Sequence, residues 1–187
     1  IVGTLTETVS EGNTISWAGD TAEFTEGTDA ADTFGGILDL AGNMSYNDAP
    51  GWHLDTTFSG LDPNKVYTYA GTVNRNGGDS YGERVTNWMI LGSEGYVFGS
   101  TEGTHKVADD AVEFSTGNNV AGYVARWTDI QPSAEGTFTI RTSHGIGEEN
   151  GGLPGAHAYK GYAGGLFLLM EQTSITNQPT APAVEVF

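Results

Sequence analysis

The chain has 187 residues, 37% of them hydrophobic, and 24 Asp and Glu against seven Lys and Arg, which gives a net charge of -17. This length suits one domain with a sizeable core, and the scarcity of cations argues against nucleic acid as a partner. No apolar run approaches the length of a membrane span, so membrane insertion is not expected, and the lack of cysteine removes disulfides and Cys-based zinc sites.

Short segments that alternate apolar and polar residues follow one another along the chain. The first two expected strands are 14–19 and 51–60. The pattern is clear at 66–73, where Tyr67 and Tyr69 share one face. Successive side chains of a strand point to opposite sides of the sheet, so this alternation predicts a strand. Further expected strands are 84–92, 95–100, 111–116 and 120–130.

The last two expected strands differ in pattern. In 136–143, Phe138 and Ile140 point one way while Thr139 and Arg141 point the other, which predicts a sheet with one wet face. Segment 166–172 is apolar on both faces, which predicts a more central strand.

Glycine-rich breaks separate these segments. The 28 glycines make long helices unfavourable, because each costs roughly 1 kcal/mol in a helix interior. About ten short strands with turns between them predict an all-β fold, a two-sheet antiparallel β-sandwich with jelly-roll topology, over residues 1–172. The two prolines within 173–187 favour an extended linker to a further module.

Four segments carry a resemblance to a known family. They are FSGLDPNKVYTY (58–69), ERVTNWMILG (83–92), VARWTDIQPSAEGTFTIRTS (124–143) and GGLFLLMEQ (164–172). Together they resemble the galactose-binding-like jelly-roll modules of secreted bacterial proteins, many of which are attached to enzymes that act on polysaccharides. Such modules place a Gly-Leu-x-Pro turn before a Tyr-rich strand, as residues 60–63 do, and a Pro-x-x-x-Gly turn before the penultimate strand, as residues 132–136 do.

The resemblance spans about residues 56–172. It implies an extracellular or cell-surface location, covalently linked neighbouring domains, and a structural calcium ion, because jelly-roll modules often carry one. Acidic, Gly-rich loops could supply the oxygen ligands that calcium prefers, although none has EF-hand spacing. The candidate loops contain Asp29 and Asp32, Asp79 and Glu83, Asp109 and Asp110, and Glu148, Glu149 and Asn150.

No motif predicts catalysis. The four histidines stand outside any His-x-x-x-His spacing, and the chain has no Gly-x-Ser-x-Gly elbow. Among 24 acids, spacing alone does not single out the carboxylate pair of a glycosidase. The chain is therefore expected not to be an enzyme.

Loop 74–84 combines the side chains of a sugar-binding surface. Sugars need a flat aromatic ring for stacking and amide, acid or guanidinium groups for their hydroxyls. We predict that Tyr81 or Trp52 stacks on a sugar ring while Arg75 or Arg84 bonds its hydroxyls or a carboxylate. The predicted ligand-binding residues are Trp52, Asn74, Arg75, Asp79, Tyr81, Arg84 and Trp88. The pattern around Trp88 fits a buried position as well, and the arginines could instead neutralise neighbouring acids.

Three functions follow from these observations. The first is a non-catalytic carbohydrate-binding module of a larger secreted or cell-surface protein, with a polysaccharide or other glycan as partner. The second is a structural or adhesive surface module stabilised by calcium. The third is a β-sandwich polysaccharide lyase or hydrolase, because Arg75, Tyr81 and Arg84 imitate the tyrosine base and neutralising arginine of such lyases.

Overall fold

The computed structural model describes residues 1–8, 16–18, 23–39, 44–47, 49–154 and 159–172. Its strands are β1 (Val2–Thr8), β2 (Ser16–Ala18), β3 (Met44–Tyr46), β4 (His53–Ser59), β5 (Tyr67–Thr72), β6 (Val85–Leu91), β7 (Gly95–Phe98), β8 (His105–Ala108), β9 (Ala111–Ser115), β10 (Ala125–Gln131), β11 (Phe138–His144), β12 (Ala163–Gly164) and β13 (Leu166–Glu171). The helices are α1 (Asp29–Phe34) and the short 3-10 turns η1 (Gly78–Tyr81) and η2 (Glu148–Asn150). The predicted linker 173–187 lies outside the described residues.

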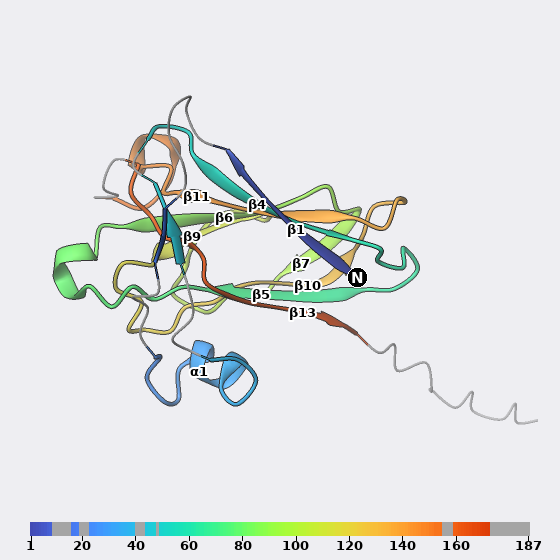
Figure 1. Cartoon of the computed structure of the whole chain (residues 1–187), viewed down its shortest axis with the longest axis horizontal. Coiled ribbons are helices and arrows are strands. Elements are labelled where there is room, and N and C mark those ends of the chain that lie inside the picture. The colour runs from blue at the N-terminus through green and yellow to red at the C-terminus, as the bar shows by residue number, and fades with distance from the viewer. Residues whose placement is uncertain (9–15, 19–22, 40–43, 48, 155–158, 173–187) are drawn as a thin grey trace, which may run out of the picture.

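Two antiparallel sheets face each other in Figure 1. The larger has the strand order β1-β4-β11-β6-β9-β8, the smaller has the order β13-β5-β10-β7, and a minor sheet has the order β12-β3-β2. All pairs among the described strands are antiparallel. The predicted all-β antiparallel sandwich is confirmed, while the jelly-roll topology stays a prediction.

The main core fills the space between the two sheets. In β11, Phe138 and Ile140 point inward and Thr139 and Arg141 point outward, so the predicted alternation is confirmed. The inner face of the smaller sheet contributes aromatic side chains, including Trp127 of β10. Each large apolar side chain buried in this way contributes about 1.5–3 kcal/mol, so the packing of the two inner faces holds the sheets together.

Helix α1 covers the outer face of the smaller sheet, where the sequence pattern indicated no helix. The Oγ1 atom of Thr28 caps the helix by accepting the N–H of Ala31 at 3.4 Å. The buried side chains of Ala30 and Phe34 pack on this sheet face, and Figure 1 shows α1 beneath β5 and β13. A six-residue helix has little stability of its own, so this packing is what holds it.

The prediction that 166–172 is a central strand is wrong. Strand β13 stands at the end of the described order of its sheet and pairs only with β5. Both of its faces are apolar because Leu166 and Leu168 pack in the cluster under α1, while Phe167 and Leu169 pack against the main core. The helix thus covers the outer face of β13, so this strand is apolar on both faces although it stands at the end of its sheet.

A part-buried ion pair attaches α1 to β10. The Nη2 and Nη1 atoms of Arg126 donate to Oδ1 and Oδ2 of Asp29 at 2.6 and 3.0 Å. The hydroxyls of Thr101 and Thr33 donate to the same carboxylate. Burial raises the pKa of Asp29, but the hydrogen bonds from Arg126, Thr101 and Thr33 outweigh burial and leave the pKa below its usual value of 3.8.

We expect Asp29→Asn to lower the free energy of unfolding by about 1–2 kcal/mol at neutral pH, after allowance for solvent screening of this part-exposed pair. Because the folded-state pKa is lowered, the ionised carboxylate stabilises the fold above the unfolded-state pKa, and this stabilisation is lost as the pH falls through the folded-state pKa. Urea unfolding at a series of pH values should show a constant advantage of the parent above about pH 5 that disappears in acid. An advantage that persists in strong acid would contradict this account.

Candidate functional site

Loop 74–84 connects β5 to β6 and is tied to the end of β9 by its backbone. The N–H of Arg75 donates to the carbonyl of Thr116 at 2.8 Å, and the N–H of Gly77 donates to that of Gly117 at 2.9 Å. At the far end of the loop, the carbonyl of Arg84 accepts the N–H groups of Thr116 and Gly117 at 3.0 and 3.1 Å. The loop therefore continues the sheet and is fixed at both ends.

Two glycines allow Tyr81 to lie flat against this loop. A Cβ atom at residue 77 would lie 1.5 Å from Cδ2 of Tyr81, and one at residue 117 would lie 1.9 Å from the Tyr81 carbonyl oxygen. Any other residue type would push the tyrosine away, because real Cβ contacts are far longer. The position of Tyr81 thus depends on Gly77, which lies against its ring, and on Gly117, which lies against its backbone.

Three tyrosines, of which Tyr162 is buried, and two arginines pack against one another around this loop. The guanidinium carbon of Arg84 lies 3.8 Å from the centre of the Tyr81 ring and 5.5 Å from that of Tyr162, and Arg84 also donates to the Tyr162 hydroxyl. Arg75 lies 5.5 Å from the Tyr81 ring, and Tyr46 packs edge-on against Tyr162 at 5.9 Å. We call this set, Tyr46, Tyr162, Arg84, Tyr81 and Arg75, the Tyr-Arg ladder. Cation-π contacts of this kind contribute about 0.5–2 kcal/mol each and orient the guanidinium groups.

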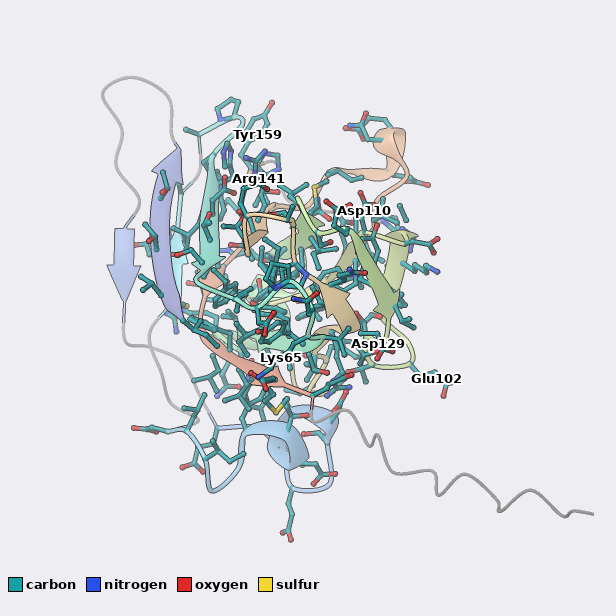
Figure 2. All side chains as sticks on the ribbon, turned by 90° about the vertical axis from the view of Figure 1, so that its right-hand side faces the viewer. Lys65, Glu102, Asp110, Asp129, Arg141 and Tyr159 are labelled. Carbon is teal, nitrogen blue, oxygen red and sulfur yellow. The ribbon has the colours of Figure 1, made fainter. Side chains whose placement is uncertain are left out.

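The electrostatic setting of Arg84 differs from that of four other cations, which pair with acids. Ion pairs join Lys65 to Glu171, Lys106 to Asp109, Arg126 to Asp29 and Arg141 to Asp55. Figure 2 labels Arg141, which projects from β11 on the larger sheet. Arg84, by contrast, has two tyrosine rings and one hydroxyl as partners, and no ion pair among the described residues includes it. Although the chain has a net charge of -17, the N–H groups of this half-buried guanidinium bond to no carboxylate of the described residues.

Asn74 was predicted to face a ligand, but its side chain is buried. Its Oδ1 accepts the N–H groups of Asn76 and Asn119, both at 3.0 Å. Asn119 in turn donates from Nδ2 to the Val73 carbonyl at 3.2 Å and to the Thr72 hydroxyl at 3.1 Å. Asn74 therefore fixes the base of the loop, because its side-chain oxygen accepts hydrogen bonds from two backbone N–H groups.

The two predicted tryptophans are fully buried, so neither presents a ring face to a ligand. Trp52 donates from Nε1 to the carbonyl of Tyr159 at 2.8 Å and packs in a small cluster beside the larger sheet. Trp88 lies on the inner face of β6 and stacks on Phe114 with ring centres 5.8 Å apart. The prediction that Trp52 stacks on a sugar is therefore wrong, because its ring is buried. For Trp88, the structure agrees with the buried alternative.

Of the remaining predicted residues, Arg75, Tyr81 and Arg84 come together in the ladder. Asp79 lies in η1, and its side chain is outside the described part of the structure. Sequence reasoning missed Tyr46 and Tyr162, which reach the ladder from β3 and from the segment before β12. Only the proximity of β3 and β12 in the minor sheet could have pointed to them, and no local pattern predicts that pairing.

The expectation of a calcium ion stays a prediction. Among the described residues, no three His, Asp or Glu side chains gather as a metal site requires. Asp29, one of the candidate ligands, already accepts hydrogen bonds from Arg126 on both oxygens. Asp109 is likewise paired, with Lys106 at 2.6 Å.

The fold and the ladder define an antiparallel β-sandwich domain with a fixed aromatic and cationic loop next to its larger sheet. Comparison with models of protein families, with curated proteins and with solved structures finds no match. Within the described ranges, no helix has the length and apolar character needed to cross a membrane.

Proposed function

We propose that this chain is a non-catalytic carbohydrate-binding module that holds a glycan on the Tyr-Arg ladder. The observation that carries the proposal is the placement of Arg84, which is held between Tyr81 and Tyr162 and pairs with no carboxylate of the described residues. A guanidinium held in this way offers forked donors to sugar hydroxyls or to a sugar carboxylate.

Tyr46 replaces the tryptophans as the stacking platform in this proposal. Tyr46 is 39% exposed, and its edge-on contact with Tyr162 fixes it against the tyrosine whose hydroxyl accepts a hydrogen bond from Arg84. The Tyr81 ring is less suitable, because the guanidinium of Arg84 lies over it at 3.8 Å. In this proposal the apolar face of a sugar ring stacks on Tyr46, and the arginines bond the hydroxyls at its polar edge. Sugar sites need both kinds of contact.

The rigidity of the ladder favours binding. Ordering a mobile side chain on binding costs about 0.5–1.5 kcal/mol, and Arg84 is already ordered by its ring contacts and by its bond to the Tyr162 hydroxyl. The loop backbone is likewise fixed by its bonds to Thr116 and Gly117. A rigid sheet behind a polar loop is a common way to hold a binding site.

Arg84→Gln should weaken glycan binding by about tenfold to a hundredfold, because a hydrogen bond from a charged group to a ligand contributes about 1.5–3 kcal/mol. The protein should stay folded, with a loss of stability of about 1 kcal/mol from the cation-π contacts. Affinity electrophoresis through xylan, galactan, alginate and polygalacturonate measures the binding, and thermal melting measures the fold.

A double variant separates the local contact from the overall charge. Adding Glu102→Gln, at an exposed position, to Arg84→Gln restores the net charge, so binding should stay as weak as in the single variant. Retardation of the parent by none of the four polysaccharides, or equal retardation of parent and Arg84→Gln by the acidic alginate and polygalacturonate, would overturn the proposal. Release of reducing sugar by the parent would replace it with the lyase or hydrolase alternative.

A further inference from the structure

A groove of about 570 Å³ runs along β7, the edge strand of the smaller sheet. Residues 94–98 line it together with Lys106 of β8 and Asp109, which follows that strand. Strands β7 and β8 are the last described strands of their two sheets, so the groove lies where the sandwich is open. Its volume falls within the range of about 300–1,000 Å³ that is usual for small-ligand sites.

The groove combines aromatic rings with charged groups. The Nζ atom of Lys106 lies 4.7 Å from the centre of the Phe98 ring and 2.6 Å from Oδ1 of Asp109. Burial raises the pKa of Tyr96, and the nearby carboxylates of Asp110 and Asp109 raise it further, which places its hydroxyl within their electrostatic reach. The Tyr96 hydroxyl can donate and accept hydrogen bonds.

A second, smaller hollow lies near the Glu94 end of the groove. It has a volume of about 310 Å³ and is lined by residues 63–66 and by Gln131. The carbonyl of Gln131 accepts the N–H of Glu94 at 2.9 Å, so the end of the groove and the second hollow share this contact. Lys65, labelled in Figure 2, lines the second hollow and pairs with Glu171.

We propose that the groove and the second hollow together form a second glycan site, separate from the ladder, that takes a neutral oligosaccharide. This inference rests on the proposed function of the domain. Carboxylates at Glu94 and Asp109 accept sugar hydroxyls, the amide of Gln131 both donates and accepts, and Tyr96 supplies an apolar ring face. Two neighbouring hollows fit a chain of several sugar units better than a single ring.

The charge balance selects a neutral ligand. Four carboxylates, those of Glu94, Asp109, Asp110 and Glu171, lie in or beside the hollows, whereas Lys65 and Lys106 are the cations that line them and each is already paired with an acid. A glycan that carries its own carboxylates would be repelled here, while hydroxyls form charge-assisted hydrogen bonds with the acids. The ladder, with its two arginines, has the opposite preference.

The test is a titration of the full chain with cellohexaose, xylohexaose and mannohexaose, followed by backbone amide chemical shifts. At least one of these probes should shift the amides of residues 94–98, 106–109 and 131. The variant Glu94→Gln with Asp109→Asn should lower the affinity at these amides at least tenfold. Both side chains are exposed, so this variant should remain folded, as its spectrum will show.

The matched control is Glu102→Gln with Glu135→Gln, which changes the net charge equally at two other exposed positions and should leave binding intact. Arg84→Gln should also leave the shifts along β7 intact. Shifts confined to residues 74–84 would overturn the second site and keep the proposed function. No shift with any of the three probes would overturn this inference alone, since the ladder is tested separately by affinity electrophoresis, with alginate and polygalacturonate among the polysaccharides. An equal loss of affinity in the control variant would show that overall charge, and not this site, causes the effect. Shifts along β7 with a lysine-rich peptide but none with the sugars would show that the site binds a basic peptide instead of a glycan.

Discussion

Trp88→Ala should lower the free energy of unfolding by about 3–5 kcal/mol, the usual cost of truncating a buried aromatic side chain. Trp88 is 0% exposed, stacks on Phe114 with an angle of 11° between the rings, and fills the core between the sheets. Small domains have a total stability of about 5–15 kcal/mol, so this loss leaves a marginal fold. Urea unfolding followed by tryptophan fluorescence and circular dichroism measures the change.

Trp88→Phe is the matched control. The indole Nε1 of Trp88 is buried and has no hydrogen-bond partner among the described residues, so phenylalanine removes an unpaired polar group while it keeps most of the ring. This gain offsets part of the lost volume, and the variant should lose much less stability than Trp88→Ala. If Trp88→Ala instead melted like the parent but lost glycan binding, the residue would return to the list of ligand contacts.

Glu113→Gln should lower the free energy of unfolding by about 2–3 kcal/mol, although it exchanges near-isosteric side chains. The carboxylate of Glu113 is 0% exposed on β9, where Oε1 accepts the N–H of Ile146 at 2.6 Å and Oε2 accepts that of Leu153 at 2.8 Å. A carboxamide accepts at one position only and would turn an NH2 group toward the other backbone donor. One buried hydrogen bond to a charged acceptor is therefore lost.

Hydrogen exchange in segment 145–154 measures the loss of this hydrogen bond directly. The segment's other hydrogen bonds include the Gly145 N–H to the Val85 carbonyl and the contact of His105 Nε2 with the Gly151 carbonyl, both at 2.8 Å. Amide hydrogen exchange should therefore quicken at Ile146 and Leu153 well before the sheets open. Glu148→Gln, at an exposed position of the same segment, should change stability by less than about 0.5 kcal/mol. Unchanged exchange in Glu113→Gln would show that the carboxylate does not hold the segment.

Much of the local structure is determined by the sequence itself. Phe138 and Ile140 alternate with polar residues, and a strand is the backbone conformation that sends alternate side chains to opposite faces. The clustering of Arg75, Tyr81 and Arg84 is also local, because a short loop held by glycines keeps residues that are close in sequence close in space. These parts of the fold and of the candidate site were predictable.

Only the tertiary structure decided which of these residues are buried. Either face of β6 could have faced the core by its own pattern, and Trp88 is inside because that face meets the aromatic side chains of the opposite sheet. The side-chain oxygen of Asn74 accepts the N–H of Asn119, and Tyr162 contacts Arg84 from a distant part of the chain. Such contacts depend on strand pairing between residues far apart in sequence, whose register no local pattern encodes, and on the cover that each sheet face receives once the chain has folded.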